Sequence, residues 1–392
     1  MTSPGAHLRD KYAIVGVGQS QLGQVPGVGP TGLLAQAMKA AIEDAGLGKC
    51  DIDGIVSRGP DDIYCHHQEM GEILGIDAQF STSVDNGGAS QILSIILATM
   101  AIDAGLCQTV ICGYGRDSFS RTHRSKEART SMDLIPAEQR SVEFGPEFGL
   151  FGAVGTHAFG ATRHMHLYGT TREHFGSVAI TFRKHASKNP LAQMQKPITL
   201  EDYLRARLIT YPFGLYDCSL TTDGAGAVIV TSAEQARDLR HPPVHIRGFG
   251  TFNNLRGWFF DDHMVCTAAK KSAEKAYAMA GVGPEDIDTA QIYDCFTYMV
   301  VTQLEDYGFC AKGEGGPFVA SGALDIGGAL PTNTSGGQLS EGHVEGMLQI
   351  VEAVHQLRRD RPEGRQVKDA EIALVSGHGG NTVCHSTLIL RR

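Results

Sequence analysis

An internal repeat constrains the fold of this chain more than any other feature. The segment Ala45-Gly46-Leu47-Gly48 recurs as Ala280-Gly281-Val282-Gly283, and the nearby Asp51-Ile52-Asp53 recurs as Asp286-Ile287-Asp288. The spacing between the first and second copy is the same for both segments. A repeat on this scale predicts two halves built on one plan.

The surroundings of the two copies also match. Each copy follows a stretch with the apolar spacing of a helix, residues 34–45 and 268–280, and precedes a short apolar run, residues 54–57 and 289–293. A glycine follows each predicted helix, where it takes the left-handed conformation that ends helices. The unit is therefore a helix, a glycine cap and a strand.

Further elements extend the match between the halves. Both halves contain a predicted opening strand, a Gly-Gly turn, a helix and another strand. These are residues 11–18, 87–88, 90–105 and 109–112 in the first half, and residues 244–250, 336–337, 344–358 and 371–375 in the second. Strands that alternate with helices predict an α/β fold with parallel or mixed sheets covered by helices.

The repeat predicts a division into residues 1–240 and 241–392. Residues of about 117–212 have no counterpart in the second half, and they are rich in His, Arg and aromatic side chains. One amphipathic stretch, residues 171–188, predicts a helix there, and residues 228–230 predict a strand after it. We expect this inserted loop region to shape a binding cleft.

Composition excludes several classes of protein. Hydrophobic residues make up 42% of the 392 residues and charged residues 20%, which is typical of a globular protein. A net charge of −9 argues against a nucleic-acid-binding surface. No apolar run reaches the roughly 18–20 residues that span a membrane. Nine cysteines without a regular spacing favour a reducing compartment, so we expect a cytoplasmic protein.

Three familiar motifs are incomplete. Gly16-Val17-Gly18 follows a predicted strand, but Gln21 stands where a dinucleotide-binding fingerprint needs glycine. The segments Cys65-His66-His67 and His164-x-His166 lack the separated ligand pairs of a zinc site, so we expect no metal. The basic run 121–129 reads as a solvated face, with a contact to nucleotide phosphates as the alternative.

Two segments join reactive side chains to the places where α/β proteins bind ligands. Tyr293-Asp294-Cys295-Phe296-Thr297 ends a buried strand, and residues 333–343 run through two glycines from Asn333 to His343. Ligands collect at strand carboxyl ends and helix N-termini, where backbone groups are unsatisfied. Tyr293, Cys295 and His343 would supply acid–base chemistry there. The alternative is a core tyrosine, a buried cysteine and a capping histidine.

These segments resemble the thiolase superfamily, in particular the sterol-carrier-type thiolases and their lipid-degrading relatives. The resemblance covers almost the whole chain, and its motifs are residues 168–175, 185–190, 217–227, 293–297, 333–346 and 376–380. It implies a thiolase fold of five layers, αβαβα, made from two similar halves. It also implies a homodimer and a CoA thioester held largely by the inserted loop region, with coenzyme A as part of the substrate rather than as a bound cofactor.

Members of this branch often work with a separate subunit that carries a zinc ribbon and an OB-fold. The resemblance therefore implies a heterotetramer of two copies of this chain and two of that subunit. The chain itself has no Cys-x-x-Cys pair.

The chain departs from the family at the nucleophile. A thiolase carries a catalytic cysteine at the turn before the buried helix of its first half, and that position falls on Gly88, followed by Ala89-Ser90. Thiolysis requires a sulfur that attacks the ketone and holds the acyl group, which glycine cannot do. Without a cysteine side chain, we expect room for a bulky substituent on the substrate.

The second departure is Tyr293, where relatives commonly have histidine. Members with tyrosine resemble thiolase-like aldolases of steroid side-chain degradation, which cleave β-hydroxyacyl-CoA thioesters by a retro-aldol route. His343 matches the histidine of the family's Gly-His motif, whereas these aldolases place a tyrosine at or beside it. The chain thus combines features of both groups.

We therefore predict an acyl-CoA aldolase that cleaves a bulky, steroid-type β-hydroxyacyl-CoA to a ketone and a short acyl-CoA. Tyr293 and His343 would form the acid–base pair, and Gly88 would donate its N–H to the enolate oxygen. Residues 376–380 would supply a second backbone donor, and we expect Ser376, His378 and Asn333 to line the substrate site. Two alternatives are an acetyl-CoA acyltransferase with Cys295 as a displaced nucleophile and a non-catalytic scaffold that binds acyl-CoA.

Overall fold

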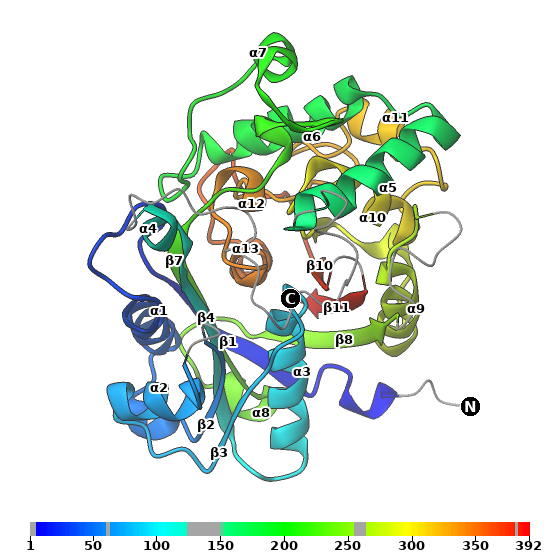
Figure 1. The fold of residues 1–392 in the computed structure, drawn as a ribbon. Helices are drawn as coiled ribbons and strands as arrows, with labels where there is room; N and C mark the ends of the chain where they lie inside the picture. Colours follow the sequence, from blue (N-terminus) through cyan, green and yellow to red (C-terminus); the bar gives the residue numbers. More distant parts are fainter. Residues whose placement is uncertain (1–4, 60–62, 124–149, 151, 255–263, 381–382) are drawn as a thin grey trace.

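The computed structural model describes residues 5–59, 63–123, 150, 152–254, 264–380 and 383–392. Within these residues a nine-stranded mixed sheet runs through the molecule in the order β3-β2-β4-β7-β1-β8-β11-β10-β9 (Figure 1). The strands are β1 (Tyr12–Gln19), β2 (Gly54–Arg58), β3 (Phe80–Ser83), β4 (Thr109–Asp117), β7 (Asp223–Ser232), β8 (Val244–Asn253), β9 (Thr289–Gln291), β10 (Ile372–Gly379) and β11 (Cys384–Arg391).

The two halves of the sheet repeat one pairing pattern. In the first half, β2 is parallel to β3 and β4, while β7 is antiparallel to β4 and β1. In the second half, β9 is parallel to β10, while β11 is antiparallel to β10 and β8. Two residue pairs between β1 and β8, Ala13 with His245 and Ile14 with Val244, join the halves. The predicted duplication is confirmed at the level of topology.

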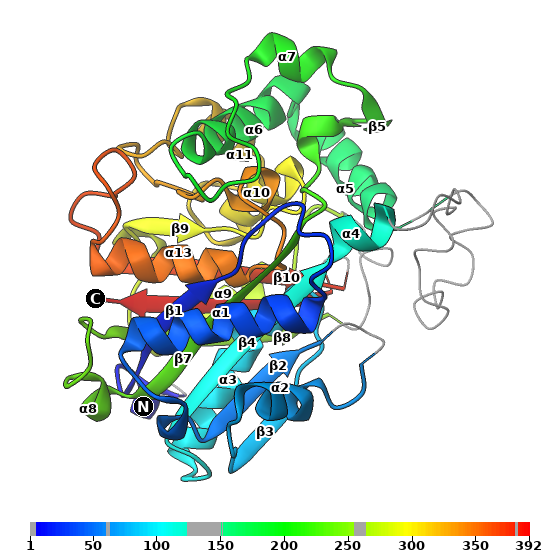
Figure 2. The ribbon, with the colours of Figure 1, turned by 90° about the vertical axis from the view of Figure 1, so that its left-hand side faces the viewer.

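Helices complete five layers. Helices α3 (Ser90–Asp103) and α13 (Met347–Arg358) lie in the middle, where each contacts strands of both halves. Helices α1 (Pro30–Ala45) and α2 (His66–Leu74) cover the outer face of the first half, and α9 (Ala269–Ala280) covers that of the second. Figure 1 shows α3 and α13 between these outer helices, and Figure 2 gives the side view. The expected αβαβα arrangement is confirmed.

Equivalent residues of the repeat have equivalent structural roles. Gly46 and Gly281 cap α1 and α9 in the left-handed conformation, with φ of 72° and 67°. The carboxylate of Asp53 accepts the backbone N–H of Thr109 at 2.8 Å, and that of Asp288 accepts the N–H of Ile372 at 2.8 Å. In each half an aspartate thus ties two parallel strands together. The division at residue 240 itself stays a prediction.

Residues 152–212, the larger described part of the predicted inserted region, lie on the side of the second half, where α5 (Gly152–Tyr168) and α6 (Arg172–Ala186) contact its helices (Figure 2). Helix α6 confirms the predicted amphipathic helix, and it contacts α10 (Thr297–Asp306), α11 (Gly315–Ala320) and α12 (Gly337–Ser340). The other elements described here are α4 (Ser118–His123), α7 (Leu200–Arg205), α8 (Ala233–Ala236), β5 (Leu208–Thr210) and β6 (Phe213–Gly214).

The structure bears on two further sequence observations, the basic run 121–129 and the lack of a long apolar run. Of the basic run 121–129, residues 121–123 end α4, and the remainder lies outside the described residues. Among the helices in the described part of the chain, none is long and apolar enough to cross a membrane.

Candidate active site

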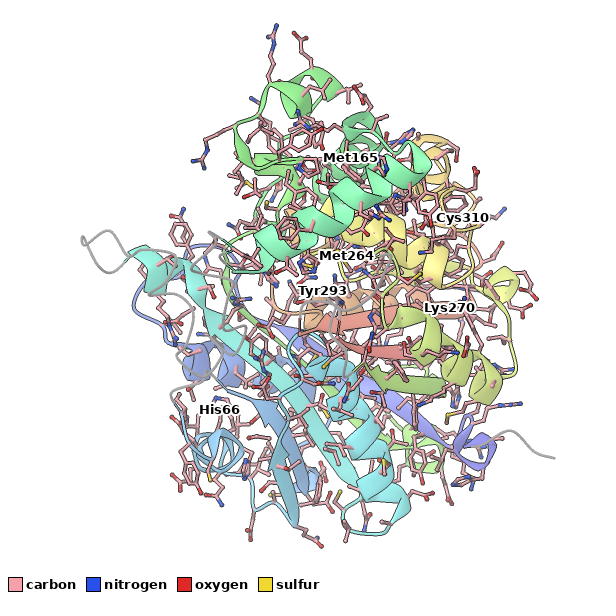
Figure 3. All side chains as sticks on the ribbon, turned by 45° about the vertical axis from the view of Figure 1, so that its right-hand side comes forward. His66, Met165, Met264, Lys270, Tyr293 and Cys310 are labelled. Carbon is pink, nitrogen blue, oxygen red and sulfur yellow. The ribbon has the colours of Figure 1, made fainter. Side chains whose placement is uncertain are left out.

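The predicted site residues come together where the two halves meet. Tyr293 lies two residues beyond β9, and His378 lies near the end of β10. Gly88 precedes α3, and His343 lies between α12 and α13, so that both flank the central helices. Figure 3 shows Tyr293 near the middle of the molecule, well away from His66. The fold therefore brings the Gly88 turn of the first half against Tyr293 and His378 of the second.

Gly88 has no room for a side chain. A Cβ atom at this position would lie 2.2 Å from Tyr293 Oη and 2.4 Å from the carbonyl oxygen of His378, both far inside van der Waals contact. The Tyr293 hydroxyl thus occupies the space into which a residue 88 thiol would project. The expected room for a bulky substrate group at this point is therefore wrong, because the phenol fills it.

Tyr293 is held by its backbone and faces His343. Its N–H donates to Ser376 Oγ at 2.8 Å, and its hydroxyl lies 3.5 Å from His343 Nε2, at the outer limit of a hydrogen bond. The two rings are nearly perpendicular, at 84°. Burial raises the pKa of Tyr293 well above its ordinary value, and the nearby Glu345 adds to this. At neutral pH the side chain is a neutral phenol that can donate a proton.

The pKa of His343 is shifted in the opposite direction to that of Tyr293. Its Nδ1 lies 3.2 Å from Ser219 Oγ, and its backbone N–H donates to Thr222 Oγ1 at 3.0 Å. Burial lowers the pKa of His343 well below 6.5, and the charge of Arg116 lowers it further. The ring is therefore neutral at pH 7. If Nδ1–H donates to Ser219, the lone pair of Nε2 faces the Tyr293 hydroxyl.

His378 and Cys295 lie on another side of Tyr293. The rings of Tyr293 and His378 are 5.7 Å apart between centroids, and His378 Nε2 lies 3.2 Å from His157 Nε2 on α5. The Cys295 sulfur lies within 4.8 Å of a ring nitrogen of each histidine. Burial, with a contribution from Asp294, raises the pKa of Cys295 far above that of a free thiol. A thiol that stays protonated is a poor nucleophile.

The side chains of Ser376 and Asn333 are bonded to the protein backbone. Ser376 Oγ accepts the Tyr293 N–H and donates to Gln303 Oε1 at 2.7 Å. Asn333 accepts the Ile292 N–H at 2.7 Å and donates to the Ile292 carbonyl at 2.8 Å. Both side chains are fully buried. They hold the backbone that presents Tyr293, and their predicted contact with substrate stays a prediction.

Sequence reasoning missed a charged cluster beside this site. Glu345 of the His343 loop forms ion pairs with Arg58, from β2, and with Arg116, from β4, the latter at 3.7 Å. Arg58 also pairs with Asp85 at 3.0 Å. Both Glu345 and Gly346 have positive φ, 45° and 88°, and non-glycine residues take such angles only when their surroundings impose them. No sequence motif marks this cluster, because Glu345 and its two arginine partners come from different halves of the chain.

His157 was also missed, since nothing in the sequence of the inserted region marks it. Three of the four histidines in the rejected metal motifs have protein partners. His164 contacts Thr170 Oγ1 at 2.9 Å and Glu305 at 3.0 Å, His66 Nδ1 lies 3.0 Å from Ser57 Oγ, and His67 Nδ1 lies 2.9 Å from Ser83 Oγ.

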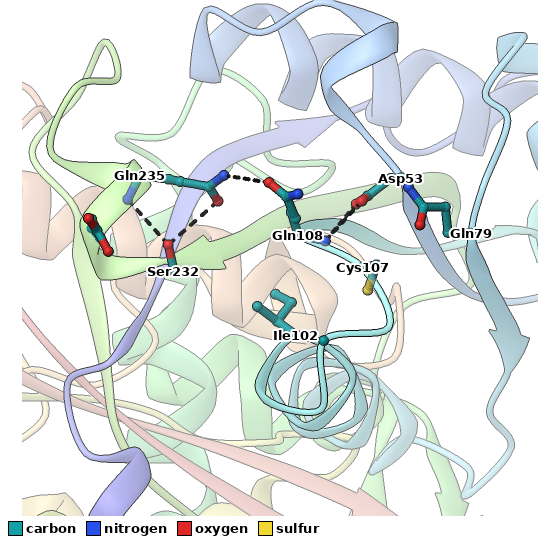
Figure 4. Close-up of a pocket in the computed structure, with 9 residues that line it drawn as sticks. Asp53, Gln79, Ile102, Cys107, Gln108, Ser232 and Gln235 are labelled. Atoms are coloured by element: carbon teal, nitrogen blue, oxygen red, sulfur yellow. Dashed lines mark hydrogen bonds between the residues drawn. The ribbon is translucent and has the colours of Figure 1, made fainter.

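A separate pocket of about 500 Å³ lies at the other ends of the parallel strands (Figure 4). Asp53, just before β2, and Gln108, just before β4, line it, and Gln235 donates to Gln108 at 3.1 Å. Asp53 is engaged with backbone N–H groups of β4 and its approach. Ligands of α/β sheets bind at the carboxyl ends of strands, so the Tyr293 region is the better candidate.

Comparisons with known proteins agree with this geometry. A family model described as "Thiolase C-terminal domain-like" matches residues 259–392. A "Steroid side-chain-cleaving aldolase" of Thermomonospora curvata is 38% identical over 359 residues, which cover 88% of this chain and 90% of the relative. The chain belongs to the thiolase superfamily. The family inferred from the sequence motifs is confirmed.

Two further relatives of this thiolase-superfamily protein carry the same kind of name. A "17-hydroxy-3-oxo-4-pregnene-20-carboxyl-CoA lyase" of Mycobacterium tuberculosis is 34% identical over 376 residues, covering 90% of this chain and 92% of the relative. Among solved structures, the "Ltp2-ChsH2(DUF35) aldolase" superposes with a TM-score of 0.89 at 35% identity and covers 98% of both chains.

Proposed function

We propose that this thiolase-superfamily protein is an acyl-CoA aldolase that cleaves a steroid-type β-hydroxyacyl-CoA into a ketone and a shorter acyl-CoA. One observation carries the proposal: the hydroxyl of Tyr293 fills the position that a nucleophilic thiol at residue 88 would need. The names of the relatives, an aldolase and a lyase, support the same reaction and a substrate with a steroid body. The aldolase predicted from the sequence agrees with them.

The pair of Tyr293 and His343 fits the proton transfers of a retro-aldol cleavage. Neutral His343 takes the proton of the β-hydroxyl, the β-carbon becomes a carbonyl, and the electrons of the broken Cα–Cβ bond form an enolate on the thioester. The Tyr293 phenol then gives its proton to Cα, and proton exchange between the two side chains restores the starting state. The distance of 3.5 Å between them suits such an exchange.

The enolate oxygen needs hydrogen-bond donors while it carries charge. We propose that the backbone N–H of Gly88 and one backbone N–H of residues 376–380 donate hydrogen bonds to this oxygen. His378, whose ring lies beside Tyr293, borders the same space. Coenzyme A enters as part of the substrate, and the reaction as written needs no other cofactor.

The acyltransferase alternative is less consistent with the geometry. It would need Cys295 as the nucleophile, and burial keeps that thiol protonated by raising its pKa. At residue 88, where a thiolase carries its nucleophilic cysteine, the Tyr293 hydroxyl and the His378 carbonyl leave no space for a side chain.

We also propose a homodimer that works with a separate subunit carrying a zinc ribbon and an OB-fold. The name of the Ltp2-ChsH2(DUF35) aldolase joins two components, which supports a second kind of chain in the assembly. A cytoplasmic location fits the nine cysteines, none of which forms a disulfide among the described residues.

The test is a product analysis of the purified protein, with and without its candidate partner. With a β-hydroxyacyl-CoA that carries a steroid body, we expect a ketone and a short acyl-CoA, detected by mass spectrometry. Tyr293→Phe should lower turnover by at least about a hundredfold, the scale of a lost acid–base group. Tyr277→Phe is the matched control: it removes a hydroxyl on α9 that donates to the carbonyl oxygen of Tyr307, just after α10, and should keep normal turnover.

Two results would contradict the proposal. One is normal turnover by Tyr293→Phe. The other is transfer of an acyl group from a β-ketoacyl-CoA to free CoA with no cleavage of the β-hydroxy substrate, which would favour the acyltransferase.

A further inference from the structure

We propose that His157, Cys295 and His378 form a binding site for a soft divalent cation such as Zn²⁺. The three side chains come from α5, from the segment after β9 and from β10, and all are buried. One nitrogen of each histidine and the cysteine sulfur lie within 4.8 Å of one another. Residues so far apart in the chain carry no metal-binding spacing, which is why the sequence led us to expect no metal.

The distances suit tetrahedral coordination. The two Nε2 atoms are 3.2 Å apart. Two nitrogens bound to zinc at about 2.0–2.1 Å in a tetrahedron would be roughly 3.3–3.4 Å apart. The separation of the two nitrogens is therefore close to that of a formed site, and the sulfur, which lies within 4.8 Å of them, would have to approach to about 3.5 Å.

One ligand is already oriented for a metal. His157 Nδ1 lies 2.7 Å from the carbonyl oxygen of Ala153, so that Nδ1 carries the proton and Nε2 keeps its lone pair. A histidine that donates one N–H to a carbonyl while the other nitrogen faces inward is the usual arrangement of a metal ligand. The aromatic ring of Phe296, 4.8 Å from that of His157, also restricts its rotation.

His378 supplies a second indication. In the ground state its Nε2–H donates to His157, which leaves its Nδ1 unprotonated. That buried Nδ1 has no hydrogen-bond partner among the described residues. On metal binding the proton moves to Nδ1 and the Nε2 lone pair becomes available, so the hydrogen bond between the two histidines is exchanged for metal bonds.

The charge balance also permits a cation. Cys295 binds as a thiolate, so one S–H proton is released for each ion bound, and the thiolate neutralises one of the two positive charges. Asp294, next in the chain, is buried nearby and accepts N–H groups from Gln338 and Leu339 at 2.9 and 3.1 Å.

Metal binding would affect catalysis through His378. The ring of His378 lies beside Tyr293, and its carbonyl oxygen lies against Gly88. We expect occupancy to pin this residue and slow turnover. This effect on turnover rests on the proposed function, whereas the binding of the metal does not.

The test uses the purified full-length chain, stripped with a chelator and titrated with Co²⁺ as a spectroscopic substitute for Zn²⁺. We expect one ion per chain, a thiolate-to-cobalt charge-transfer band and the intense visible bands of a tetrahedral site. Calorimetry with Zn²⁺ in buffers of different ionisation enthalpy should show the release of about one proton per ion.

Three variants make the result specific. Cys295→Ala should abolish the charge-transfer band and weaken binding at least tenfold, and His157→Gln should weaken binding to a similar extent. Cys112→Ala removes an equally buried thiol, bonded to the Ser94 carbonyl, and should leave the spectrum unchanged. Thermal unfolding of each metal-free variant separates a loss of ligand from a loss of fold.

A Co²⁺ spectrum without a thiolate band, or one that persists in Cys295→Ala, would overturn the proposal. The cluster would then be a hydrogen-bonded pair of neutral histidines beside a thiol. Neither result would bear on the aldolase activity, which is measured separately by the products.

Discussion

At the scale of single residues, Gly88 and Tyr293 belong together. Neither residue alone indicates a reaction, but the 2.2 Å between a Cβ at position 88 and the Tyr293 hydroxyl makes a side chain at one position incompatible with the phenol at the other. The sequence showed that a nucleophile was missing. It could not show that a hydroxyl had taken its place, because that depends on a contact between the two halves.

Gly88→Ala tests this contact. The added methyl group meets both the phenol and the rigid His378 carbonyl, so we expect a stability loss of roughly 1–3 kcal/mol from overpacking and at least a tenfold loss of turnover. Urea unfolding and steady-state kinetics give the two quantities. Gly29→Ala, at an open position with φ of −77°, is the control and should change both little. Equal behaviour of the two variants would mean that the 88 position tolerates a side chain.

The pH dependence of the reaction should report His343. Burial and Arg116 lower the pKa of this histidine, so its neutral, basic form persists below pH 6.5 and is lost only when the pH falls through that lower value. We therefore expect kcat/KM to stay at its plateau down to pH 6.5 and to fall at more acidic pH. His343→Gln should remove this fall along with most of the activity. A midpoint at or above pH 6.5 would exclude neutral His343 as the base.

At the scale of elements, the loop between α12 and α13 needs support from the other half. Glu345, a non-glycine residue with a positive φ, forms ion pairs with Arg58 and Arg116, which extend from the ends of β2 and β4. The sequence predicted both strands and the helix after the loop. It did not predict that β4 runs on to Asp117, so the position of Arg116 in the site was missed.

Glu345→Gln should disturb catalysis by releasing this loop. The substitution keeps the shape of the side chain but removes the charge that two partly buried arginines face, so we expect kcat to fall at least tenfold with a smaller change in KM. Glu345→Asp should restore part of the activity. Glu43→Gln, in an exposed pair with Lys39 at 3.8 Å, is the matched control. Unchanged kcat in Glu345→Gln would show that the loop holds its shape without the ion pairs.

At the scale of the whole molecule, each half contributes part of the site. Gly88, Arg58 and Arg116 come from the first half, and Tyr293, His343 and His378 come from the second. The repeat predicted the two halves, since it is a local and periodic signal, and the resemblance to the thiolase superfamily implied the five layers. Contacts between the halves, such as that of His157 with His378, follow from packing and have no such signal.

The halves are also tied by Arg358 at the end of α13. Its guanidinium donates to Asp44 of α1 at 2.7 Å and to the Val15 carbonyl of β1 at 2.8 Å. Arg358→Met should destabilise the fold by roughly 2–4 kcal/mol, because the half-buried carboxylate of Asp44 loses its arginine and retains the Val17 N–H and His241 as partners. Arg359→Met, at the next and more exposed position, should cost less than about 1 kcal/mol. Urea unfolding compares them, and equal losses would contradict a bridging role for Arg358.

The central claim is that carbon–carbon cleavage proceeds without an acyl-enzyme. Intact-protein mass spectrometry during turnover of a β-hydroxyacyl-CoA tests it most directly. A retro-aldol mechanism predicts an unmodified protein mass at every time point while the ketone accumulates. An acyl adduct that forms and decays at the rate of turnover, and that maps to Cys295, would contradict it.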